Sequence, residues 1–186
     1  RKNAVYVRRF IFNLTDCIAR EGEETPLSVA CGKGYASCAK LLLDSGRADP
    51  NTTLRSGATP LYRACIRGYT RCVKLLLRSG AEPNLAIHPK RRTPLFVSCE
   101  NGNKLCTRLL LKHGADPNIA DREGYFTPIY VACQNGHAHC VKLLLMSGRA
   151  DTNHQTVIGN TPLYMACEKG YTDCAKLLLH THTVRA

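Results

Sequence analysis

A Thr-Pro pair recurs every 34 residues along this chain of 186 residues, and this period constrains the fold more than any other feature. The five pairs are Thr25-Pro26, Thr59-Pro60, Thr93-Pro94, Thr127-Pro128 and Thr161-Pro162. A glycine stands nine residues after each threonine, and three consecutive leucines or similar residues follow 16 to 18 residues after it. Five matching units with constant internal spacing indicate a repeat array in which each unit is one supersecondary element.

The local chemistry of each unit predicts two short helices. Threonine supplies a side-chain oxygen for the unpaired amides of a first helix, and proline at the next position needs no amide partner. The glycine tolerates the left-handed backbone that ends this helix, and the leucine run lies in a second helix. A polar turn then leads to the next threonine. Because such a helix pair cannot bury its own apolar face, neighbouring units must stack to form one continuous core.

The repeated unit resembles that of the ankyrin-repeat family, which is a β-turn followed by two antiparallel helices. In the second unit, the residues that carry the likeness are Thr59-Pro60-Leu61, Ala64, Gly68, Leu75-Leu76-Leu77, Gly80-Ala81 and Pro83-Asn84. The resemblance covers roughly Thr25 to Leu179. It implies an all-α solenoid of helix-turn-helix repeats joined by β-turn or hairpin loops.

The chain departs from the family pattern in two respects. The family usually has histidine at the fourth motif position, where this chain has Ser28, Tyr62, Phe96, Tyr130 and Tyr164. Its unit is usually about 33 residues long, and the extra residue falls in different places in different units. Neither departure changes the expected fold.

The period divides the chain into a leading segment and five units. We expect residues 1–24 to form an N-terminal capping helix or a degenerate repeat, because their apolar residues recur at helical spacing. The expected repeats are 25–58, 59–92, 93–126, 127–160 and an incomplete fifth repeat, 161–186. A solenoid normally ends in a polar capping repeat, so either the parent protein continues or a partner covers this end.

Ten of the eleven cysteines occupy two fixed slots per unit. The slots hold Cys31, Cys65, Cys99, Cys133 and Cys167 in the first helices, and Cys38, Cys72, Cys106, Cys140 and Cys174 in the second helices. The family usually has alanine and valine there, so we interpret these cysteines as reduced, buried packing residues. A ladder of metal or redox sites is the alternative, but no unit offers the four Cys or His ligands of a structural zinc site.

The remaining motifs indicate no catalysis, metal or cofactor. The pairs His137/His139 and His180/His182 lack the geometry of a closed metal site. The chain has no glycine-rich phosphate loop, nucleophile elbow or kinase motif. The aromatic stripe at the fourth motif position is expected to stack between adjacent first helices, and stacking on nucleic-acid bases is the alternative. We therefore expect a protein that is not an enzyme.

Charge is concentrated in the second unit. The net charge of the chain is +12, and residues 59–92 carry eight Lys and Arg against one acidic residue, whereas residues 93–126 carry four of each. Arg63 and Arg67 are four residues apart and share one helix face, which the resemblance places on the concave surface. The predicted partner-binding residues are Arg55, Arg63, Arg67, Lys90, Arg91 and Arg92. A solvated basic surface that keeps the array soluble is the alternative.

These features predict a monomeric intracellular scaffold, cytoplasmic or nuclear, that binds a protein partner with an acidic or phosphorylated segment in its concave groove. Arginine suits such a segment because its planar fork matches carboxylate and phosphate. Binding of nucleic acid or another polyanion through the second repeat is the first alternative. Targeting of a larger enzyme or adaptor is the second. No apolar run approaches the roughly 20 residues of a transmembrane helix.

Overall fold

The computed structural model describes residues 24–183, which form ten α-helices arranged in five pairs. The first helices of the pairs are α2 (Pro26–Gly32), α4 (Pro60–Arg67), α6 (Pro94–Glu100), α8 (Pro128–Gln134) and α10 (Pro162–Glu168). The second helices are α3 (Ala36–Asp44), α5 (Thr70–Arg78), α7 (Lys104–Lys112), α9 (Ala138–Met146) and α11 (Thr172–Thr183). The expected capping helix or degenerate repeat of residues 1–24 lies, apart from Glu24, outside the described residues.

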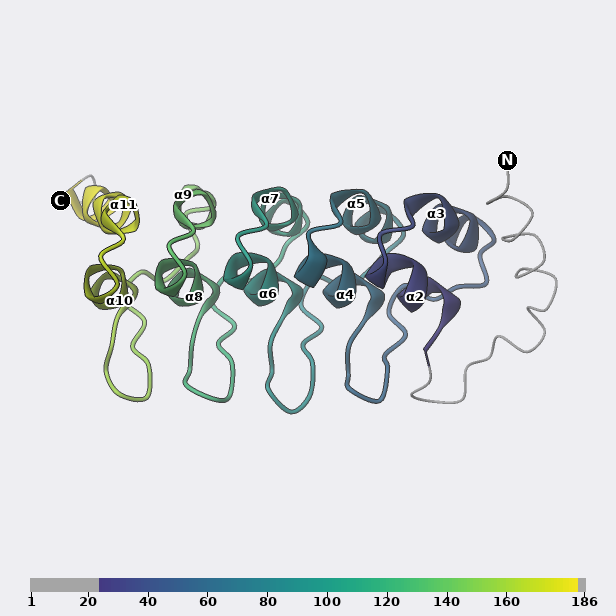
Figure 1. The fold of residues 1–186 in the computed structure, drawn as a ribbon, viewed down its shortest axis with the longest axis horizontal. Helices are drawn as coiled ribbons and strands as arrows, with labels where there is room; N and C mark the ends of the chain where they lie inside the picture. Colours follow the sequence, from purple (N-terminus) through teal and green to yellow (C-terminus); the bar gives the residue numbers. More distant parts are fainter. Residues whose placement is uncertain (1–23, 184–186) are drawn as a thin grey trace.

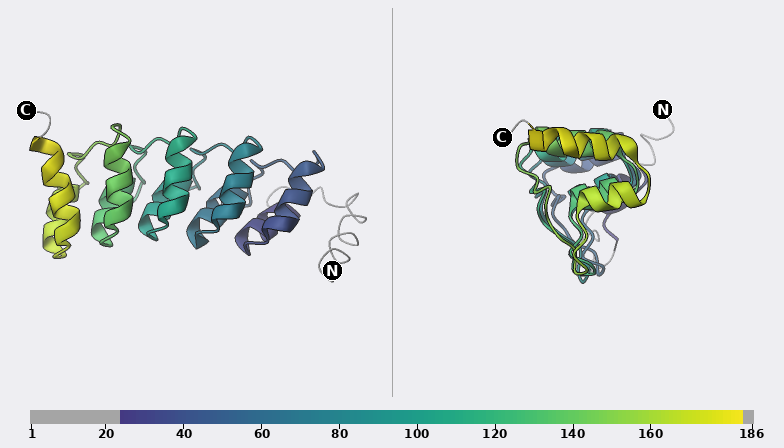
Figure 2. Two further views of the ribbon diagram at one scale, coloured as in Figure 1. Left: turned by 90° about the horizontal axis from the view of Figure 1, so that it is seen from above. Right: turned by 90° about the vertical axis from the view of Figure 1, so that its left-hand side faces the viewer.

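The helix pairs stand side by side in a row, so the protein is an all-α solenoid (Figure 1). Each first helix packs against the first helix of the next pair, and each second helix packs against the next second helix. The turns that connect successive pairs project from one edge of the row and converge on a narrow ridge (Figure 2). The predicted fold class is confirmed. None of the described helices is long and apolar enough to cross a membrane.

Threonine caps explain where the first helices begin. The hydroxyls of Thr25, Thr59, Thr93 and Thr161 each accept a hydrogen bond from the backbone amide three residues later. The following proline fills the first helical position, where a missing amide hydrogen costs nothing. Thr127 begins α8 in the same way, but its buried hydroxyl has no hydrogen-bond partner among the described residues.

The glycines that follow the first helices are required by the stacking as well as by the backbone. Gly102 has φ +66°, and a Cβ atom added to it would lie 2.6 Å from the ring of His137 in the next unit. His137 Nε2 is 3.1 Å from the carbonyl oxygen of Glu100, at the end of α6. The same packing of a residue over the glycine of the preceding unit recurs at Tyr69, Asn103 and Tyr171.

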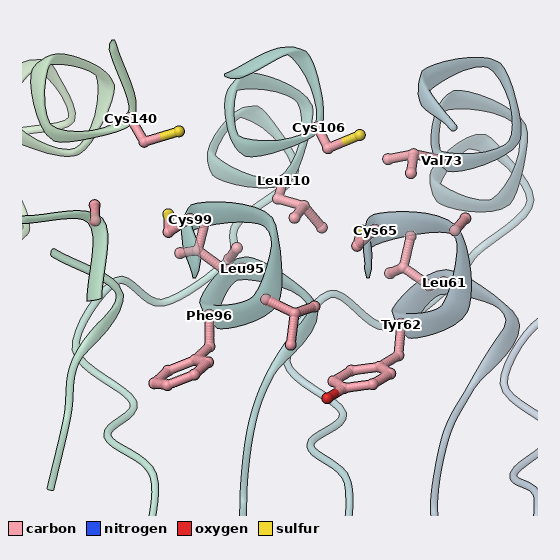
Figure 3. Close-up of a cluster of buried hydrophobic side chains, with 14 of the residues drawn as sticks. Leu61, Tyr62, Cys65, Val73, Leu95, Phe96, Cys99, Cys106, Leu110 and Cys140 are labelled. Carbon is pink, nitrogen blue, oxygen red and sulfur yellow. The ribbon is translucent and has the colours of Figure 1, made fainter. Parts of the chain in front are cut away.

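The cysteines line the interfaces between successive units. Thr107 Oγ1 lies 3.8 Å from the Cys99 sulfur and 3.6 Å from the Cys140 sulfur, so it lies between thiols of two successive units. Figure 3 shows Cys140 pointing from α9 toward the unit that holds Cys99. A first-helix thiol interacts in the same way with the second-helix thiol of the next unit at Cys31 and Cys72 and at Cys133 and Cys174, where each thiol raises the pKa of its first-helix partner. All four are free thiols.

The prediction that all ten repeat cysteines are buried is wrong at the two ends of the array. Cys167 is exposed and Cys38 is half-buried, whereas the other eight are buried. Cys167 would face the second helix of a following unit, and Cys38 would face the first helix of a preceding one. These two slots are uncovered because no neighbouring unit lies against them in the described part of the chain.

The aromatic stripe packs beneath the turns. Tyr62, Phe96 and Tyr130 are at most 7% exposed, whereas Tyr164 at the open end is 52% exposed. Figure 3 shows Tyr62 and Phe96 pointing away from the second helices, toward the turns. The one stacked ring pair among the described residues joins Tyr130 to Phe126 of its own turn, with centroids 4.9 Å apart. The rings of the stripe therefore do not stack on one another, but Tyr62, Phe96 and Tyr130 are part of the hydrophobic core, as expected of packing residues.

Candidate partner-binding surface

The structure divides the six predicted binding residues between helix α4 and two turns. Arg63 and Arg67 lie on α4. Arg55 lies in the turn before this helix, and Lys90, Arg91 and Arg92 lie in the turn before α6. Three of the six are held by carboxylates of the chain itself and three are not, and this division decides which of them a partner can reach.

Arg63 is a contact between two units. Its Nη1 atom lies 2.8 Å from Glu24 Oε1 and 3.4 Å from the hydroxyl oxygen of Ser28 in the preceding unit. Its guanidinium also occupies the space beside Gly32, where an added Cβ atom would meet Arg63 Nε at 2.7 Å. The side chain is only 26% exposed. The expectation that Arg63 faces solvent freely is therefore wrong.

Arg92 is the centre of an ion-pair network beneath the turns. Its Nη1 lies 3.1 Å from Glu100 Oε1, its Nη2 lies 3.0 Å from Glu123 Oε2, and its Nε lies 3.5 Å from Asp121 Oδ2. The guanidinium also lies over the Phe96 ring, 5.0 Å from its centroid. Because the side chain of Asp121 is fully buried, Arg92 supplies the charge that compensates it. Arg92 is a structural residue of the turns.

Lys90 completes this network on its exposed side. Its Nζ lies 3.0 Å from Glu123 Oε1, and both side chains are about half exposed. Hydrogen bonding to Lys90, together with the positive charges of Lys90 and Arg92, lowers the pKa of Glu123. Lys90 therefore carries a positive charge that the neighbouring glutamate largely neutralises.

The other three predicted residues, Arg55, Arg67 and Arg91, are exposed and form no ion pair with any carboxylate of the described residues. Arg91 has φ +58°, which turns its side chain outward at the turn tip. A fourth exposed residue, Arg122, escaped the sequence analysis because it lies in a segment with no net charge. Its backbone amide donates to the carbonyl oxygen of Lys90 at 2.9 Å, so the two turns lie side by side. We call these four arginines the free-arginine set.

The thiols of the repeat cysteines are candidate reactive groups. Burial raises the pKa of Cys65 and Cys99, and a hydrogen bond to Cys72 raises the pKa of Cys31. Hydrogen bonding has the opposite effect on the partner thiols and lowers the pKa of Cys72, Cys140 and Cys174. All of these thiols are buried, and burial limits their access to electrophiles and metal ions. Among the described residues, no group of three or more Cys, His, Asp or Glu side chains is placed to hold a metal ion.

A stripe of lysine and arginine recurs once per unit on the second helices and is exposed along its length. Its members are Lys40, Lys74, Arg108, Lys142 and Lys176. Lys142 and Lys176 line a shallow hollow between α9 and α11, together with His139 and Asp173. Lys74 and Arg108 lie outside this hollow and form no ion pair in the described part of the chain, so they are suitable control positions for charge-reversal substitutions.

Comparison with known proteins agrees with this arrangement of helix pairs. A family model that describes three ankyrin repeats matches residues 3–87, 27–121, 86–156 and 115–185, so that the matches together span nearly the whole chain. A comparison with individual curated proteins found no match. The period, the stacked helix pairs and these overlapping matches lead to one conclusion, which is that the chain belongs to the ankyrin-repeat family.

Proposed function

We propose that this chain is a non-enzymatic recognition module that binds an acidic or phosphorylated segment of a partner protein. The observation that carries the proposal is the free-arginine set, Arg55, Arg67, Arg91 and Arg122. These residues are exposed and have no carboxylate partner among the described residues, although nearby cations are paired. A guanidinium that the chain itself leaves unpaired is available to a carboxylate or phosphate of a partner.

The ordered surroundings of these arginines favour binding. The Lys90–Glu123 and Arg92–Glu123 ion pairs and the Arg122–Lys90 backbone hydrogen bond tie adjacent turns together. The turns are joined in the same way by asparagine side chains: Asn118 Nδ2 donates to the Arg149 carbonyl oxygen at 2.8 Å, and Asn118 Oδ1 accepts from the Asp151 amide at 2.8 Å. A surface that is ordered before binding loses less conformational entropy when a partner arrives.

Nucleic-acid binding through the same arginines is the second candidate, and the aromatic stripe of the first helices gives it little support. Single-stranded nucleic acid is commonly held by stacking of bases on exposed aromatic rings. In this chain Tyr62, Phe96 and Tyr130 of the aromatic stripe are buried, and Tyr164 alone among the four is exposed. A role in targeting a larger enzyme or adaptor is compatible with the proposal, because such targeting also requires a recognition surface.

We further propose that the module acts as a monomer within the reducing interior of the cell. The ten repeat cysteines are free thiols, and eight of them are buried. Free thiols persist where the compartment keeps them reduced.

Three fluorescent probes of matched length test the proposed ligand class by anisotropy: hexaglutamate, a hexapeptide of alternating phosphoserine and glycine, and a single-stranded oligonucleotide. We expect both peptides to bind, and the phosphopeptide to bind more tightly at no greater total charge, because each phosphate presents a concentrated charge and three strong acceptor oxygens to a guanidinium. We expect the oligonucleotide to bind more weakly and to lose affinity more steeply with salt. Tightest binding of the oligonucleotide at physiological salt would favour the second candidate, and failure of both peptides to bind would refute the proposal.

A further inference from the structure

The turn before α10 carries two large apolar side chains at its tip. Val157 is 67% exposed and Ile158 is 77% exposed. The turn is closed by the Thr156 amide, which donates to the Asn160 carbonyl oxygen at 3.0 Å, and by the Asn160 amide, which donates to Thr156 Oγ1 at 3.1 Å. Tight turns favour Gly, Asn, Asp, Ser and Pro, so two exposed β-branched residues at this place stabilise neither the turn nor the core.

A third exposed apolar side chain adjoins them from the preceding turn. Tyr125 is 57% exposed. The Val157 amide donates to the Gly124 carbonyl oxygen at 3.2 Å, and His154 Nε2 lies 3.1 Å from the Tyr125 carbonyl oxygen. These bonds hold the two turns together. We call Tyr125, Val157 and Ile158 the apolar tip.

The apolar tip continues a row of three members of the free-arginine set, Arg55, Arg91 and Arg122, which lie in turns, whereas Arg67 lies at the end of α4. Arg122 lies in the same turn as Tyr125, and its backbone amide is bonded to Lys90, the neighbour of Arg91. Figure 1 shows these turns side by side along one edge of the solenoid, and Figure 2 shows their ends converging on one ridge. Along this ridge, exposed cations in the turns before α4, α6 and α8 are followed by apolar side chains in the turns before α8 and α10.

We propose that the apolar tip binds an aliphatic or aromatic side chain that adjoins the acidic stretch of the partner segment. This inference rests on the proposed function and adds to it a sequence requirement for the partner, namely acidic residues with an apolar anchor at one end. The free arginines would pair with the acidic residues, while the anchor buries the apolar tip. Apolar contact supplies the affinity that exposed ion pairs alone do not provide.

A protein segment fits the ridge better than a membrane surface does. A peripheral membrane protein combines exposed apolar and basic side chains, as this ridge does. However, the apolar side chains come from two adjoining turns only. An apolar patch of this size matches one or two side chains of a protein segment, whereas a membrane-bound helix buries a long apolar face.

Peptide binding to the full chain tests the inference. The probes are hexaglutamate alone, hexaglutamate with Leu-Phe at its C-terminal end, hexaglutamate with Leu-Phe at its N-terminal end, and both extended peptides with Ser-Ser in place of Leu-Phe. The test variant is Val157→Ser with Ile158→Ser, and the control is Leu41→Ser with Met146→Ser, which changes exposed apolar residues of the second helices. Circular dichroism checks that both variants keep the fold.

We expect one of the two Leu-Phe peptides to bind at least about tenfold more tightly than its Ser-Ser counterpart. This gain should disappear in the test variant and persist in the control. The inference is overturned if neither Leu-Phe peptide binds more tightly than its Ser-Ser counterpart, or if the difference in affinity persists in the test variant. It is also overturned if vesicles of phosphatidylserine bind the chain through the apolar tip while the peptides show no such difference. Binding of hexaglutamate without any gain would overturn this inference and leave the proposed function standing. Absence of binding by every peptide would remove both.

Discussion

The guanidinium of Arg63 on α4 lies 2.8 Å from the carboxylate of Glu24, at the start of the preceding unit. This ion pair crosses the first interface of the described array, and Ser28 adds a second contact to the same guanidinium. Arg63 therefore stabilises stacking of the first two units, whereas Arg67, one helical turn later, is exposed and free.

Substitution of these two arginines should separate their roles. Arg63→Glu places two carboxylates side by side and should lower the free energy of unfolding by about 1–2 kcal/mol. The loss is moderate because solvent reaches the Glu24 side of the contact. Arg67→Glu should change it by less than about 0.5 kcal/mol. Urea unfolding followed by circular dichroism measures both. Equal changes in the free energy of unfolding would show that the contact between Arg63 and Glu24 does not stabilise the fold.

Removal of the Arg92 guanidinium should lower the free energy of unfolding more than either of these substitutions. Arg92→Met leaves the buried carboxylate of Asp121 without a compensating charge and should lower the free energy of unfolding by about 2–4 kcal/mol. Lys90→Met removes an exposed partner of the same network and should cost less than about 1 kcal/mol. A small loss for Arg92→Met in the same unfolding experiment would mean that the network is not a structural element of the turns.

The glycines provide a matched test of stacking between units. Gly102→Ala and Gly114→Ala both place a side chain at positive φ, +66° and +85°, which costs about 1–2 kcal/mol. At Gly102 the new methyl group also meets the His137 ring, whereas at Gly114 it meets nothing within 4 Å. We expect Gly102→Ala to be the more destabilising by about 1 kcal/mol or more. Equal losses of thermal stability would contradict the packing of His137 over Gly102.

Thiol reactivity should follow position in the array. In a Cys17→Ser background, which removes the cysteine outside the described residues, N-ethylmaleimide should modify Cys167 first and Cys38 second. The eight buried cysteines should react only when the interfaces open, because burial keeps the reagent away from their sulfur atoms. Peptide mass spectrometry of timed samples gives the order. Modification of Cys99 or Cys140 as fast as Cys167 would contradict the closed interfaces.

The sequence predicts the fold closely because each unit repeats the same local chemistry. The Thr-Pro pairs place the starts of all five first helices, at Pro26, Pro60, Pro94, Pro128 and Pro162, where the structure has them. The cysteine slots are also predicted as buried packing positions, and eight of the ten are buried. The exposure of Cys38 and Cys167 was not predicted. Each occupies the same position in its repeat as the buried cysteines, but in the described array it has no neighbouring unit on one side.

The candidate surface was predicted less well, because it depends on contacts between units. Counting charge within one unit cannot show that Arg92 and Lys90 are paired with Glu123 of the next turn. A signal for these pairs exists in the sequence. Glu123 follows Lys90 and Arg92 by about one repeat length, and residues one period apart lie side by side in a stacked array. The contacts of Arg122 and Tyr125 with neighbouring turns depend on backbone geometry that composition does not reveal.

The most direct test of the central claim is the affinity of hexaglutamate for two double charge reversals, measured by fluorescence anisotropy at one salt concentration. The first variant, Arg67→Glu with Arg91→Glu, changes the free-arginine set. The second, Lys74→Glu with Arg108→Glu, makes the same change in net charge on the second helices. We predict that the first variant weakens binding by about tenfold or more, while the second stays within about threefold of the unmodified chain. Equal weakening by both variants would show that net charge alone attracts the peptide, and the account of a defined binding surface would be wrong.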